Sequence, residues 1–137
     1  MAEYERSRTM PALPEQVFDQ AADIDQLDSW LPNALHVHVE EPPAVTVHDD
    51  HGEQDTSALL RARRDQMRLE WGTREESYYA GWLQVAGIGS GASEVTVHLS
   101  FYDERHDPGE RSAHEALDAS LRDLQERVRQ RVENAAG

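Results

Sequence analysis

The stretch Ser112–Val132, SAHEALDASLRDLQERVRQRV, decides the fold of this chain. Its apolar residues recur three or four positions apart, as they do along one side of an α-helix: they are Leu117, Leu121, Leu124, Val128 and Val132. Ser112 and Glu115 have the spacing of a capping box, so we expect the helix to begin there. The opposite side of the helix is charged, and the apolar stripe must therefore pack against the preceding chain.

That preceding chain changes to a period of two, which predicts strands that are buried on one face. The expected strands are Tyr4–Met10, Ala34–Glu40, Ala44–His48, Ser57–Arg63, Met67–Trp71, Ser77–Val85 and Val95–Phe101. The reversals between them are short, as antiparallel pairing allows, and the glycines at 87, 89 and 91 indicate a hairpin. An α+β fold follows, in which a curved antiparallel sheet grips the C-terminal helix.

Two short helices are expected between the first two strands. Pro14 suits the first position of a helix that buries Val17 and Phe18. Asp23 can cap a second helix that ends at Pro32. At 137 residues the chain has enough surface to bury for one core, and we expect a single domain over 1–137.

Four segments carry a resemblance to a known superfamily. They are Met10–Pro32 (MPALPEQVFDQAADIDQLDSWLP), Leu69–Trp71 (LEW), Tyr79–Val85 (YAGWLQV) and Ser93–Phe101 (SEVTVHLSF). The chain resembles the START-related helix-grip superfamily, SRPBCC, which includes polyketide cyclase/dehydrase-like proteins. The resemblance implies a curved antiparallel sheet of about seven strands around the long C-terminal helix, with a ligand cavity between them.

Composition narrows the possible partners. Asp and Glu number 27 against 13 basic residues, which gives a net charge of −14 and repels nucleic acid and anionic membranes. The absence of cysteine excludes thiolate metal sites and a cysteine nucleophile. No apolar run is long enough to span a bilayer, and we expect a cytoplasmic protein without a cofactor.

The inward-facing residues of this pattern are almost all apolar, which is typical of a site for a small hydrophobic or aromatic molecule. The candidate ligand-binding residues are Trp30, Leu69, Trp71, Tyr79, Leu83, Leu99, Phe101, Leu117, Leu121 and Leu124. The same side chains could instead meet and fill the core. Both alternatives follow from the pattern, and the resemblance favours the cavity.

Catalysis finds little support in this set of residues. Tyr79 is the only titratable side chain that the alternation turns inward, and a phenol is a better hydrogen-bond donor than base at neutral pH. No catalytic residue can be assigned from the pattern. The resemblance nevertheless implies an enzymatic alternative, a polyketide cyclase, aromatase or dehydratase.

The outward-facing positions carry two further hypotheses. His36, His38, His48 and His98 could bind a metal ion, but the register turns them toward solvent, so we expect none. Trp82 shares that outer register and could mark a homodimer contact. Members of the superfamily also include co-chaperone-like domains, so a protein-interaction domain is a third alternative.

Overall fold

The structure of this protein is a computed structural model, and it describes residues 2–23, 26–27, 30, 35–39, 44–49, 54–73, 79–102, 104 and 107–136. For residues 35–39, 44–49, 54–58, 73 and 135–136 it describes the backbone alone. The strands are β1 (Ala2–Met10), β2 (Leu35–Val39), β3 (Ala44–Asp49), β4 (Gln54–Arg63), β5 (Arg68–Thr73), β6 (Tyr79–Gly89) and β7 (Ala92–Phe101). The helices are α1 (Pro14–Ala21) and α2 (Glu110–Ala136), and a 3-10 turn spans Arg64–Gln66.

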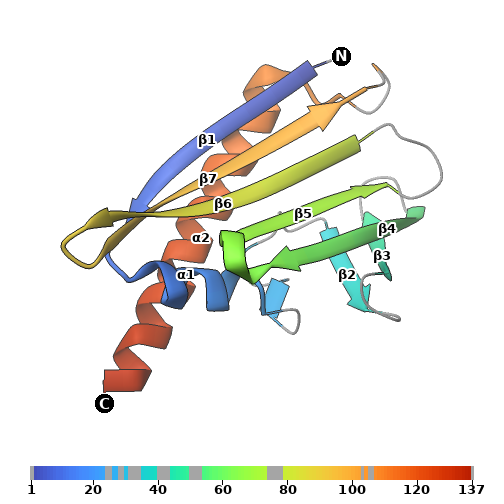
Figure 1. The fold of residues 1–137 in the computed structure, drawn as a ribbon. Helices are drawn as coiled ribbons and strands as arrows, with labels where there is room; N and C mark the ends of the chain where they lie inside the picture. Colours follow the sequence, from blue (N-terminus) through green and yellow to red (C-terminus); the bar gives the residue numbers. More distant parts are fainter. Residues whose placement is uncertain are drawn as a thin grey trace.

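The strands form one seven-stranded sheet in the order β1-β7-β6-β5-β4-β3-β2, and every neighbouring pair is antiparallel. Figure 1 shows α2 on one face of this sheet, where it crosses behind β1, β7 and β6. α1 packs beside the C-terminal half of α2, to which it is joined by the contact between Arg131 and Gln20. The expected α+β helix-grip fold is confirmed.

The hairpin that the glycines predicted is confirmed between β6 and β7. Gly89 and Gly91 have φ values of 88° and 76°, in the left-handed region that glycine tolerates without steric cost. A register shift between Gly87 and Gly89 marks a β-bulge just before the turn.

The predicted start of α2 is wrong by two residues. The helix begins at Glu110. Ser112 and Glu115 therefore lie inside the helix, where their side chains are exposed and do not cap it. The carbonyl of Gly109 accepts the first helical bond from the amide of Ala113, at 2.9 Å. Gly109 donates its own amide to the Asp107 carboxylate, so this aspartate holds the turn that starts the helix.

The first short helix is confirmed, with Pro14 at its first position and Val17 and Phe18 buried. The second, expected from Asp23 to Pro32, falls mostly on residues outside the described ranges. The amides of Gln26 and Trp30 donate to the carbonyls three residues before them, Asp23 and Leu27. These described contacts are tight turns of the 3-10 type.

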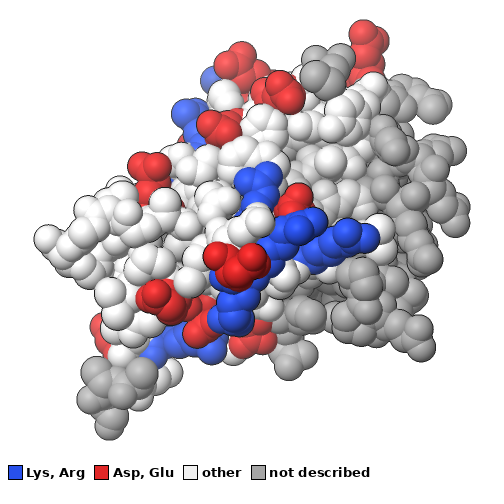
Figure 2. Space-filling model, in the orientation of Figure 1, with Lys and Arg blue, Asp and Glu red and all other residues white. Residues whose placement is uncertain are grey.

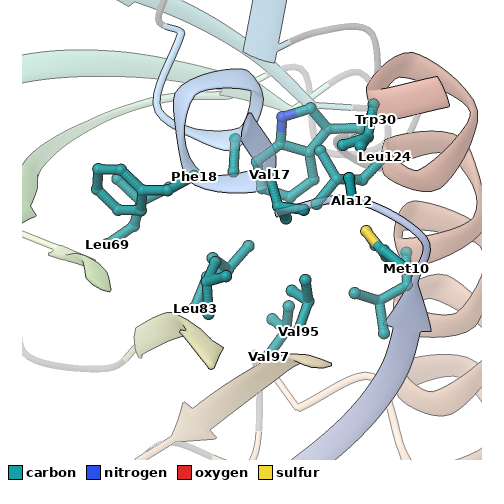
Figure 3. Close-up of a cluster of buried hydrophobic side chains, with 14 of the residues drawn as sticks. Met10, Ala12, Val17, Phe18, Trp30, Leu69, Leu83, Val95, Val97 and Leu124 are labelled. Atoms are coloured by element: carbon teal, nitrogen blue, oxygen red, sulfur yellow. The ribbon is translucent and has the colours of Figure 1, made fainter. Parts of the chain in front are cut away.

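The core lies between α1, α2 and the inner face of β5, β6 and β7. Figure 3 shows Val17 and Phe18 of α1 facing Leu83 and Val95 of the sheet. The largest side chains that are almost wholly buried are Phe18, Met10, Leu69, Leu83, Leu121 and Leu124.

Candidate binding site

The inner face of the sheet is the face that α2 covers, and its residues follow from the strand register. One cross-strand row joins Tyr4, Leu99, Gly81, Trp71 and Leu60 through the paired positions of five strands. The row beside it pairs Phe101 with Ala2 and Tyr79. The rows on the other side of it contain Val97, Leu83 and Leu69, then Val95 and Val85.

These rows differ sharply in burial. Leu69, Leu83, Val85, Val95 and Val97 are exposed by 4% or less. By contrast, other inner-face residues keep part of their surface accessible: Tyr4, Leu60, Trp71, Tyr79, Leu99 and Phe101 are half-buried. We call the first set the closed half of the inner face and the second set the open half.

Aromatic rings dominate the open half. The ring centroids of Tyr79 and Phe101 are 5.1 Å apart, and those of Tyr4 and Phe101 are 6.0 Å apart. His114, from the first turns of α2, meets Tyr4 edge to face at 5.8 Å. We call Tyr4, Trp71, Tyr79, Phe101 and His114 the aromatic cluster. Its contacts have the geometry that aromatic pairs prefer.

Trp71 lies flat against the sheet because its cross-strand neighbour is a glycine. A Cβ atom added to Gly81 would stand 2.5 Å from Trp71 Nε1, so no other residue leaves room for the indole there. In this position Trp71 Nε1 donates a hydrogen bond of 2.8 Å to Tyr79 Oη. The glycine thereby positions the polar edge of one ring of the aromatic cluster against another.

Two tyrosines of the aromatic cluster stay protonated at neutral pH. Burial raises the pKa of Tyr79 to about 12, against a smaller opposing contribution from the Trp71 hydrogen bond. The hydrogen bond of 2.6 Å from Tyr4 Oη to Asp107 raises the pKa of Tyr4 to about 12 and lowers the pKa of the aspartate. Neither phenol can act as a general base near pH 7.

The ten sequence-predicted site residues divide between the two halves. Trp71, Tyr79, Leu99 and Phe101 lie together in the open half. Those that pack into the closed core are Trp30, Leu69, Leu83, Leu117, Leu121 and Leu124. Figure 3 shows Trp30 beside Leu124 within that core.

Sequence reasoning missed His114 and Asp107. His114 lies three residues before Leu117 and extends the apolar stripe of α2 by one turn, so its periodicity could have revealed it. The Asp107-Pro-Gly109 sequence is a turn signal before a helix, which also marks a helix start. Neither signal, however, points to Tyr4, which is far away in the sequence.

The outer face carries the other candidates. Trp82 stacks on His98 with ring centroids 5.2 Å apart and contacts the Arg68 guanidinium at 4.5 Å. His98 lies within 3.2 Å of a carboxylate oxygen of Glu5. The expected outward register of Trp82 and His98 is thus confirmed. Figure 2, a view of this face, shows arginine side chains gathered over β4 and β5.

The side chains of His36, His38 and His48 lie outside the described residues. Within the described ranges, no group of three or more His, Cys, Asp or Glu side chains could hold a metal ion. No helix among the described residues is long and apolar enough to cross a membrane.

Comparison with known proteins places this geometry in a family. A family model for polyketide cyclase / dehydrase and lipid transport matches residues 1–133. The chain belongs to this family. The resemblance found in the sequence is thereby confirmed. A search of curated proteins finds no match.

Three solved structures share the fold at low sequence identity. The aromatase/cyclase Zhui from Streptomyces sp. R1128 is 15% identical with a TM-score of 0.71, and the alignment covers 99% of this chain and 98% of that one. A START superfamily protein from Mycobacterium smegmatis is 13% identical with a TM-score of 0.73, covering 93% and 97%. XoxI from Bacillus cereus is 18% identical with a TM-score of 0.75, covering 93% and 96%.

Proposed function

We propose that this protein binds a small, uncharged hydrophobic or aromatic molecule on the open half of its inner face, against the aromatic cluster. The observation that carries this proposal is the difference in burial along one sheet face. Large apolar side chains are held there in an ordered arrangement while part of their surface is accessible. Exposed apolar surface that is confined to one concave face is a frequent mark of ligand binding.

Charge supports an uncharged ligand. Every arginine with a described side chain is exposed except Arg68, which is half-buried against Trp82 on the outer face. The net charge of −14 opposes the approach of an anion. Membership of a family described by lipid transport and polyketide chemistry also supports an apolar ligand.

A titration with the uncharged fluorophore N-phenyl-1-naphthylamine tests the proposal. We expect saturable binding of one probe molecule, and we expect Phe101→Ala to weaken it about tenfold, which corresponds to about 1.4 kcal/mol of lost contact. Trp82→Ala is the matched control, because it removes an aromatic ring from the outer face and leaves the inner face intact. Absence of saturable binding, or equal weakening by both variants, would contradict the proposal.

Catalysis is a second candidate, favoured by His114. This histidine touches Tyr4 in the aromatic cluster, where an imidazole could transfer a proton during cyclisation or dehydration of a polyketide-like substrate. Turnover of a linear poly-β-ketone should then fall at least about 100-fold in His114→Gln while probe affinity stays within about twofold. Equal turnover by the two proteins would remove His114 from any mechanism.

We also propose that Trp82, on the outer face, lies in a homodimer contact. Its ring is half-buried and already contacts two neighbouring strands. Sedimentation of the wild type at rising concentration, beside Trp82→Ala, tests this contact. We expect the wild type to dimerise and the variant to stay monomeric, and a monomer in both cases would rule the contact out.

A further inference from the structure

Two buried polar atoms have no hydrogen-bond partner among the described residues. They are Trp30 Nε1 and Ser120 Oγ. The side chains are exposed by only 3% and 6%, so bulk water does not solvate them. Buried polar groups are normally paired, and a group left alone loses its hydration without compensation. These two atoms therefore point to a missing partner.

Two other buried polar side chains among the described residues are paired, which makes the two exceptions informative. Ser93 Oγ donates a hydrogen bond of 2.7 Å to the carbonyl of Ala12. The Gln20 side chain donates to Gln26 at 2.8 Å and accepts from Arg131 at 3.3 Å. The fold thus satisfies buried serine and glutamine side chains elsewhere.

The position of Ser120 on α2 shows which way its hydroxyl group faces. With 3.6 residues per turn, Asp118 and Gln125 fall on one flank of the apolar stripe, and Ser120 falls on the other. The first flank faces β1, because Arg6 pairs with Asp118 and Arg8 with Gln125. Ser120 therefore lies on the flank that faces away from β1.

Trp30 lies on that same side of the helix. Arg131, which shares the flank of Ser120, pairs with Asp23 in the segment that leads to Trp30. The indole packs in the same cluster as Leu124, one turn after Ser120. Along α2, Ser120 lies about 9 Å beyond His114 of the aromatic cluster, in the direction of Trp30.

We propose that Ser120 and Trp30 form a polar subsite at the inner end of the binding site, where both donate hydrogen bonds to one neutral acceptor oxygen of the ligand. This inference rests on the proposed function, since the apolar part of the ligand occupies the aromatic cluster. An indole N–H can only donate, and a serine hydroxyl can donate, so the pair fits an acceptor. A carbonyl or ether oxygen is such an acceptor.

The subsite selects a neutral oxygen over a carboxylate. No described arginine is buried, so a carboxylate at this depth would have no enclosed cation among the described residues. Burial of an unpaired charge costs far more than two hydrogen bonds return. We therefore assign the ligand class as an aromatic or acyl compound with an uncharged acceptor oxygen at one end.

Three probes of similar shape test the subsite by calorimetry or competition with N-phenyl-1-naphthylamine. They are the ketone 2-acetylnaphthalene, the hydrocarbon 2-isopropenylnaphthalene and the anion 2-naphthoate. We expect the wild type to bind the ketone about tenfold more tightly than the hydrocarbon, and the anion more weakly than both. In Ser120→Ala we expect the preference for the ketone to fall to about threefold, and in the double variant with Trp30→Phe to disappear.

Ser93→Ala is the matched control, because it removes a buried hydroxyl group that has a partner. We expect it to lower the denaturation midpoint and leave the ketone preference unchanged, whereas Ser120→Ala leaves the midpoint unchanged or raises it. A wild type that binds hydrocarbon and ketone equally would overturn the subsite and leave the proposed function standing. A wild type that binds none of the three probes, and no N-phenyl-1-naphthylamine, would overturn both.

Discussion

The two halves of the inner face share strands β5, β6 and β7 and differ in what covers them. Over the closed half, α1 and α2 both pack on the sheet, and Phe18 and Leu83 are fully buried. In the open half, the N-terminal part of α2 contacts Tyr4 through His114. The comparison teaches that one apolar face can supply stability at one end and keep accessible rings at the other.

Local contacts hold α1 in place over the closed half. Ser93 donates a hydrogen bond to the carbonyl of Ala12 just before α1, and Pro14 lies directly over Gly87 of the sheet. These contacts fix α1 against the hairpin end of β6 and β7. The open half instead contains large rings that contact one another across strands, which leaves accessible surface beside them.

The largest expected effect comes from truncating two phenylalanines, one packed against the closed half and one within the open half. We expect Phe18→Ala, in α1 over the closed half, to lower the free energy of unfolding by about 3–5 kcal/mol because it leaves a cavity in a packed core. Phe101→Ala, in the half-buried open half, should cost roughly 1–2 kcal/mol. Urea unfolding at pH 7 measures both values, and equal costs would erase the distinction between the halves.

A methyl group added beneath Trp71 should have the next largest effect. Gly81→Ala forces the indole off the sheet and should destabilise the fold by about 1–3 kcal/mol, with loss of the hydrogen bond from Trp71 to Tyr79. Gly72→Ala is the control, since the nearest atom to its added Cβ is 3.4 Å away, and it should cost less than about 0.5 kcal/mol. If both variants unfold at the same urea concentration, Gly81 does not have the proposed role.

The third effect sharpens the comparison through the pH dependence of stability. Because Tyr79 has a pKa of about 12 in the folded protein and 10.0 as its ordinary value, its contribution to stability is complete below pH 10. That contribution is lost as the pH rises from 10 to 12, where the unfolded chain ionises first. The free energy of unfolding, measured over this pH range, should fall less steeply in Tyr79→Phe than in the wild type, by up to about 1.4 kcal/mol per pH unit. Equal slopes for variant and wild type would mean that Tyr79 is solvated like a free phenol.

Much of the fold was predictable from the sequence because period and turn signals are local. Alternation identified the strands and the inward side of Leu83 and Leu99, and helical spacing identified the buried stripe of α2. The start of α2 was predicted wrongly because Ser112 and Glu115 match a capping box, whereas Gly109 and its bond to Asp107 decide where the helix begins.

The division of the site into halves was not predictable, because alternation shows which face a side chain occupies and not what covers it. The alternation places Leu83 and Phe101 on the same face of the sheet, yet Leu83 is fully buried and Phe101 is half-buried. The close approach of Trp71 to Gly81 depends on strand register, and the bond from Tyr4 to Asp107 joins residues 103 positions apart. Such contacts are set by tertiary packing.

The most direct test of the account is an isotope-filtered NOE experiment on the protein saturated with N-phenyl-1-naphthylamine. The account predicts contacts from probe protons to the rings of Tyr79 and Phe101 and to the methyl groups of Leu99. Contacts to Trp82 on the outer face, with none to these three residues, would contradict it.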